Sequence, residues 1–78
     1  MATIIGVKLE QREHSASELQ KIATEFGCSI KTRIGLHDVQ DHTCSPSGII
    51  LFEVVSREDE FEKALKAIDG TIVKRMAF

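Results

Sequence analysis

Two histidines and a cysteine lie close together in the segment HDVQDHTC, which runs from residue 37 to residue 44. Imidazole nitrogens and thiolates are ligands that suit zinc, nickel and copper, so His37, His42 and Cys44 are candidate metal ligands. On a strand, His42 and Cys44 would point to the same face because they are two residues apart, and His37 would approach from the opposing arm of a hairpin. One interpretation is therefore a metal-binding or metal-sensing module.

The same segment also has the composition of a hairpin tip. The Asp, Thr, Ser and Pro residues around the three candidate ligands are residues that favour turns. Three interpretations stay open: a transition-metal site, a polar tip that binds nothing, and a contact to a small effector. The sequence indicates no other cofactor.

Catalysis is not indicated elsewhere in the chain. No nucleophile has a base at a recognisable spacing, and there is no glycine-rich phosphate loop. Cys44 beside His42 would lie in a loop without a group to orient the imidazole. We therefore expect a protein that is not an enzyme.

Composition and length predict a single domain over residues 1–78. A chain of this size buries only about 60% of its unfolded surface, so a partner subunit would supplement its stability. The 10 Lys and Arg residues are scattered among 12 Asp and Glu residues, which argues against direct binding of nucleic acid. Two cysteines without CxxC spacing, no signal segment and no membrane segment together predict a cytoplasmic protein.

Two helices are expected from capping signals and apolar stripes. Ser15 with Glu18, and Ser56 with Asp59, have the spacing at which a side chain caps the first turn of a helix. Gly27 would end the first helix in the left-handed conformation. The apolar stripes are Leu19, Ile22, Ala23 and Phe26 in the first helix, and Phe61, Ala64, Leu65 and Ile68 in the second.

Strands are expected over residues 3–9, 28–36, 48–55 and 71–78, where apolar residues alternate or run together. In the second of these, Ile34 and Leu36 share one face, and Lys31 and Arg33 lie on the other, as a potential anion-binding edge on its open side. The order βαββαβ predicts an α+β ferredoxin-like fold. Its four-stranded antiparallel sheet has the order 4-1-3-2 and carries two helices on one face.

That arrangement leaves the second face of the sheet without helices. The segment GIILFEVV is apolar on both sides, which is typical of a strand that is covered on both faces. A contiguous apolar face indicates an interface, so we expect a homodimer or homotetramer that buries ~800 Å² per subunit there. The residues expected on this face are Ile4 or Ile49, Leu51, Val55, Ile72 and Met76.

The segment RIGL, the strand GIILFEVV and the ending ALKAIDGTIVKRMAF resemble the family of iron-only hydrogenase system regulators, which are small ACT-like proteins. The resemblance runs from Ile4 to Met76, but the segment between Leu36 and Gly48 is longer than in that family. It implies a regulatory module in which an amino acid or similar effector binds where two domains meet. The implied contacts are Glu10, His14, Ser15 and Arg33.

The positive end of the first helix would suit the carboxylate of such an effector. Beside this regulatory interpretation, a metal-binding module remains open. A third interpretation is a purely structural interaction subunit that binds no small molecule.

Overall fold

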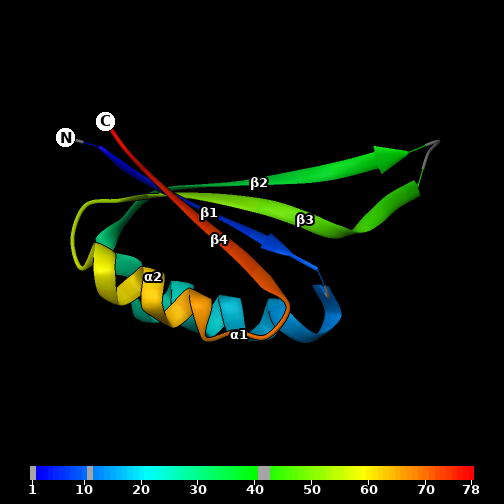
Figure 1. Ribbon diagram of the computed structural model, residues 1–78, viewed down its shortest axis with the longest axis horizontal. Coiled ribbons are helices and arrows are strands. Elements are labelled where there is room, and N and C mark those ends of the chain that lie inside the picture. Colours follow the sequence, from blue (N-terminus) through cyan, green and yellow to red (C-terminus); the bar gives the residue numbers. More distant parts are fainter. Residues whose placement is uncertain (1, 11, 41–42) are drawn as a thin grey trace.

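A computed structural model shows one four-stranded sheet with two helices packed against one of its faces (Figure 1). It describes residues 2–10, 12–40 and 43–78, and the side chains of residues 11–14 and 37–47 lie outside that description. The elements are, in chain order, β1 (Thr3–Leu9), α1 (Arg12–Glu25), the 3-10 turn η1 (Gly27–Ser29), β2 (Ile30–Gln40), β3 (Thr43–Val54), α2 (Glu58–Lys66) and β4 (Thr71–Ala77).

The sheet has the order β2-β3-β1-β4, and every neighbouring pair is antiparallel. The predicted ferredoxin-like βαββαβ fold is confirmed, including the strand order. The hairpin of β2 and β3 is longer than predicted, because pairing continues to Gln40 opposite Thr43, and it extends past the rest of the sheet (Figure 1). Neither helix in the described chain combines the length and apolar character that crossing a membrane requires.

The core lies between the helices and one face of the sheet. Alternate residues of β1 are buried, and both predicted helix stripes contribute, which confirms them. Phe61 of α2 links the layers: its ring centroid lies 5.1 Å from that of Phe52 on β3 and 5.2 Å from that of Phe26. The core residues are Ile5, Val7, Leu9, Leu19, Ala23, Phe26, Phe52, Val54, Phe61, Leu65 and Ile68.

Ser15 does not cap α1, which begins three residues earlier, at Arg12. The side chain is only 1% exposed, and its hydroxyl donates a hydrogen bond of 3.0 Å to the carbonyl oxygen of Asp69. The bond joins residues that are 54 positions apart, which no local pattern reveals. Ser15 therefore ties α1 to the turn before β4.

The second predicted cap is also wrong. The residue before α2 is Arg57, in the left-handed conformation (φ 53°), and no side chain caps this end of the helix. The Ser56 hydroxyl instead donates to the hydroxyl oxygen of Ser29 at 2.8 Å. The Arg57 guanidinium lies 4.3 Å from the centroid of the Phe26 ring, and this cation–π contact offsets part of the strain at Arg57.

Gly27 does not take the left-handed conformation that was expected of it. The chain continues instead from α1 into η1, which begins at Gly27. The left-handed glycine of this fold is Gly70, with φ 78°, in the turn before β4. A glycine can adopt that conformation without the steric cost that a Cβ atom brings.

An irregularity at the start of β2 determines which face each side chain takes. Ile30 pairs with Val54 and Thr32 pairs with Glu53, so the register shifts by one residue between them. Ile30 therefore packs on the helix side, whereas Ile34, which should have shared its face, lies on the opposite side. The expectation that Arg33 lies on the open side of the strand is wrong for the same reason.

Charged side chains fasten α2 to β4. Arg75 of β4 reaches Asp59 at 2.6 Å and Glu62 at 3.1 Å, and Lys66 reaches Glu62 at 3.0 Å. Hydrogen bonds from Lys66 and Arg75 lower the pKa of the Glu62 carboxyl below its ordinary value. Glu62 therefore stabilises the fold in its ionised form.

We predict that Ser15→Ala lowers the free energy of unfolding by about 1–2 kcal/mol, because the Asp69 carbonyl loses its donor. Urea unfolding followed by circular dichroism measures this difference. Ser17→Ala is the matched control, since Ser17 is an exposed residue of the same helix. If both substitutions gave the same small change, the bond to Asp69 would not contribute.

We predict that the stability of the wild type decreases as the pH is lowered through the range in which Glu62 becomes protonated. A carboxyl group with a lowered folded-state pKa stabilises fully above its unfolded pKa and loses that effect at lower pH. Glu62→Gln should therefore show a shallower loss of thermal stability between about pH 5 and pH 3. Lys66→Gln should give an intermediate slope, and a slope for Glu62→Gln equal to the wild type would contradict the role of this carboxylate.

Candidate functional site

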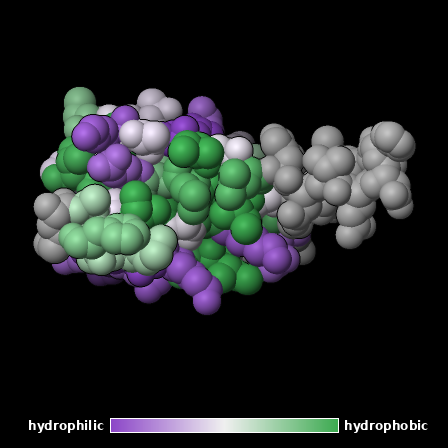
Figure 2. Space-filling view, turned by 90° about the horizontal axis from the view of Figure 1, so that it is seen from above, coloured by the Kyte–Doolittle hydropathy of each residue, from purple (hydrophilic) through white to green (hydrophobic). Residues whose placement is uncertain are grey.

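The face of the sheet that carries no helix is apolar. Among the described residues, the large hydrophobic side chains with the greatest exposure, between 45% and 74%, all belong to this open face or to the residues directly after its strands. Figure 2, which views the molecule from the open side, shows hydrophobic side chains gathered across it. These residues are Ile34, Leu36, Val55, Ile72, Met76 and Phe78.

The pairing of the strands arranges the open face in three rows that run across the sheet. Each row contains one residue from each strand, in the order β2, β3, β1, β4, and alternation along the strands places all of them on the same side. The rows are Thr32, Glu53, Ile4 and Met76; Ile34, Leu51, Gly6 and Lys74; and Leu36, Ile49, Lys8 and Ile72.

The predicted members Ile4, Ile49, Leu51, Ile72 and Met76 are therefore in place. Sequence reasoning missed Ile34 and Leu36, because a period of two shows which residues share a face without showing which face that is. The register shift after Ile30 is what turns both side chains toward the open side.

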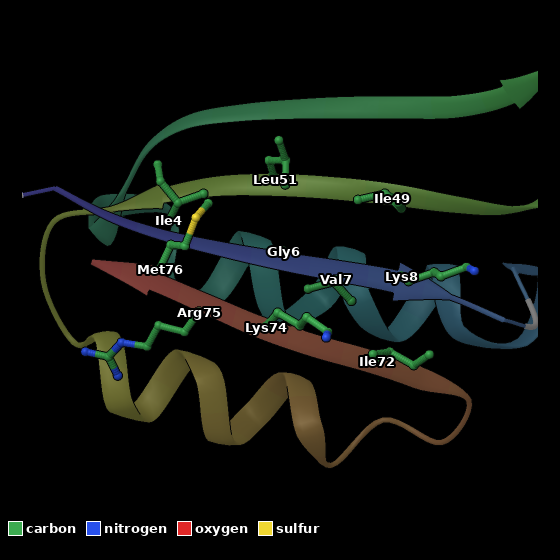
Figure 3. Close-up of a pocket in the computed structure, with 10 residues that line it drawn as sticks. All are labelled: Ile4, Gly6, Val7, Lys8, Ile49, Leu51, Ile72, Lys74, Arg75 and Met76. Carbon is green, nitrogen blue, oxygen red and sulfur yellow. The ribbon is translucent and has the colours of Figure 1, made fainter. Parts of the chain in front are cut away.

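A shallow hollow lies at the centre of the open face, with a volume of about 500 Å³ (Figure 3). Gly6 forms its floor, because this position on the central strand β1 has no side chain. A Cβ atom at Gly6 would lie 3.2 Å from the Cδ2 atom of Leu51. The hollow thus exposes apolar side chains of three neighbouring strands, which water solvates poorly.

Three charged residues lie within this apolar surface. Lys8 and Glu53 are half-buried on the two central strands, and Lys74 is exposed on the edge strand β4. Among the described residues, none of the three forms an ion pair. Arg75, which follows Lys74, points away toward α2, as alternation along the strand requires (Figure 3).

Lys8 and Glu53 can be picked out in the sequence because each is a charged residue within an otherwise apolar strand. We predicted no role for Lys8 or Glu53 from the sequence. Both interrupt runs of β-branched and apolar residues, and the pairing of β1 with β3 places them at opposite ends of the same surface. A surface that buried these charges would have to place an opposite charge beside each of them.

The residues predicted to bind an effector are not brought together in one chain. The backbone N–H of Glu10 donates to the Gly70 carbonyl oxygen at 2.8 Å, and Ser15 is buried against the turn that contains Asp69. Arg33 lies on the edge strand β2, where its guanidinium donates to the side-chain oxygen of Gln20 on α1 at 2.9 Å. The side chain of His14 lies outside the described residues.

Arg33 borders two smaller hollows of about 160 Å³ each on the helix side of the sheet. One lies against the end of α1 and includes Gly27. The other lies over β2 and β3, where Gly35 and Gly48 leave the backbone uncovered. The Arg33 guanidinium is 5.8 Å from the centroid of the Phe52 ring, which holds a positive charge at the edge of both hollows.

The candidate metal ligands lie outside the part of the chain whose side chains are described. For their backbone, the structure pairs His37 with Gly48 and Cys44 with Val39, and His42 lies outside the described residues. Within the described residues, no three His, Cys, Asp or Glu side chains form a group that could hold a metal ion. Cys28, which is not among the candidate ligands, is exposed in η1.

The fold has counterparts among solved structures. The chain is 20% identical to the uncharacterized protein TM1266 from Thermotoga maritima, with a TM-score of 0.78, and the match covers 96% of this chain and 92% of that one. It is also similar to a formyltetrahydrofolate deformylase from Pseudomonas putida KT2440, at 13% identity and a TM-score of 0.59. That match covers 100% of this chain but only 29% of the deformylase.

No family model and no curated protein matches the sequence. The structural matches show a shared fold, and at 20% and 13% sequence identity they show nothing about function. The open face and the hollows beside Arg33 are therefore interpreted from their own chemistry.

Proposed function

We propose that this chain is a non-catalytic, ACT-like regulatory module that forms a homo-oligomer through the open face of its sheet. Binding of a small effector to the module would change the arrangement of the subunits, and this change would be transmitted to a partner. The observation that carries the proposal is the exposed apolar face. The fold shared with TM1266, together with the resemblance to iron-only hydrogenase system regulators, supports a small ACT-like module.

Physical chemistry supports the assembly. Exposing Ile34, Leu36, Ile72 and Met76 on one surface costs free energy that burial recovers, at about 25 cal/mol per Å². A chain of 78 residues has only one small core, so burial of a second face adds a large fraction to its stability. A cytoplasmic protein with such a face would avoid aggregation only if another surface covered the face.

We further propose that the effector carries a carboxylate or another small anion, and that Arg33 binds it. A guanidinium group recognises a carboxylate through paired hydrogen bonds. Arg33 stands at the edge of two hollows, and its neighbours Gly35 and Gly48 let a ligand approach the backbone closely. A neighbouring subunit would have to supply the remaining contacts, since the chain does not bring Glu10 and Ser15 to Arg33.

We predict that static light scattering at micromolar concentration shows a dimer or tetramer of the wild-type chain. Ile34→Lys places a charge at the exposed apolar centre of the second strand and should shift the protein toward monomer. Because Ile34 is already half-exposed in the single chain, the monomer should remain folded by circular dichroism.

Ser17→Lys is the matched control, since it adds the same charge on the exposed surface of α1. This variant should keep the wild-type mass. A wild-type monomer at all accessible concentrations would contradict the proposed assembly.

We predict that a panel of amino acids and small carboxylates contains at least one that raises the thermal midpoint, because a ligand of the folded state stabilises it by mass action. Arg33→Gln should remove this shift. Lys31→Gln, which removes an exposed cation of the same strand, should retain it. A shift that survives Arg33→Gln would place the effector elsewhere.

A further inference from the structure

The charges on the open face set a condition on whatever covers it. Glu53 and Lys8 are half-buried on the two central strands, so any partner that covers the centre of the face removes both from water. A charge that loses its hydration without an opposite charge beside it costs several kcal/mol. The covering surface must therefore bring a cation to Glu53 and an anion to Lys8.

The single chain cannot satisfy this condition by itself. Glu53 pairs across the strands with Ile4, and Lys8 lies four residues further along β1, which places the two roughly 13 Å apart along the strand direction. That separation is beyond the reach of a direct ion pair. A second copy of the chain carries the same two charges at the same separation, so it can supply both partners at once.

We propose that two chains pack open face to open face about a two-fold axis that brings Glu53 of each chain opposite Lys8 of the other. This inference rests on the proposed assembly through the open face and adds its orientation. Two equivalent ion pairs then form, as two-fold symmetry requires. Packed sheets lie about 10 Å apart, a gap that a glutamate and a lysine side chain span together.

The geometry of the sheet selects this orientation. A two-fold axis that lies in the plane of the interface and runs across the strands exchanges the two ends of the face, which sets Glu53 opposite the partner's Ile49. A small tilt of this axis within that plane sets Glu53 opposite the partner's Lys8 instead. In an idealised sheet with strands about 4.8 Å apart, the required tilt is about 20°. The strands of the two sheets then cross at about 40°, close to the ~30° at which twisted sheets pack face to face.

The alternative axis, parallel to the strands, exchanges β1 with β3. It would set Glu53 over the partner's Ile4 and Lys8 over the partner's Ile49, so that four charges would be buried without partners. Lys74 differs from Lys8 because it lies on the edge strand β4. Its ammonium group can remain in water at the rim while its aliphatic stem covers apolar surface.

The test is a charge exchange followed by sedimentation or light scattering. Glu53→Lys and Lys8→Glu should each raise the dissociation constant of the assembly by about tenfold or more, because each places like charges opposite each other. The double variant Glu53→Lys/Lys8→Glu should restore the wild-type constant, since the ion pairs re-form with reversed polarity. Lys63→Glu, on the exposed side of α2, is the control and should have no effect.

Each other outcome overturns a defined part of the inference. If single reversals leave the constant unchanged, or if Glu53→Lys/Lys74→Glu restores it in place of the Lys8 pair, the orientation is wrong while the proposed assembly stands. A wild-type monomer would overturn both.

Should a reversal prevent folding, Glu53→Gln and Lys8→Gln provide the same test at smaller amplitude. Their effects on the constant should be less than additive, because either one already breaks the pair. Full additivity would overturn the orientation.

Discussion

Two helices of this length can cover only one face of a four-stranded sheet, and the rest of the structure follows from that constraint. The covered face holds the aromatic contact of Phe26, Phe52 and Phe61, around which both helices and the central strands pack. The uncovered face is built from the alternate residues of the same strands, so the register of each strand decides which of its residues face the helices and which face away.

Polar contacts arrange the helices on the covered face more than local capping does. Ser15 joins α1 to the turn that carries Asp69, Ser56 joins the start of α2 to Ser29, and Arg75 reaches across from β4 to α2. All three connect segments that are distant in the sequence. These specific bonds fix the positions of α1 and α2 on the sheet. On the open face, only the shape of the surface and its three charges can select a binding partner.

Sequence reasoning recovered the order of the elements, the strand order and the apolar stripes of both helices, because each depends on periodicity within a short segment. It misassigned Ser15 and Ser56 because a serine followed three residues later by an acid looks the same whether its hydroxyl caps a helix or bonds to a distant group. It ended the second strand too early and began the third too late, because pairing between Gln40 and Thr43 depends on both arms together. It could not see which side of β2 faces the helices, since one additional residue between Ile30 and Thr32 reverses that assignment.

Because of the irregularity at Lys31, the number of residues at this point determines which side chains β2 contributes to the open face. Pairing on both sides of that residue is fixed by β3, so removing one residue there would rotate the remainder of the second strand by half a turn. Ile34 and Leu36 would then enter the core and the Arg33 guanidinium would emerge on the other surface. A deletion of one residue at this point would therefore replace Ile34 and Leu36 on the open face with Arg33 and Gly35.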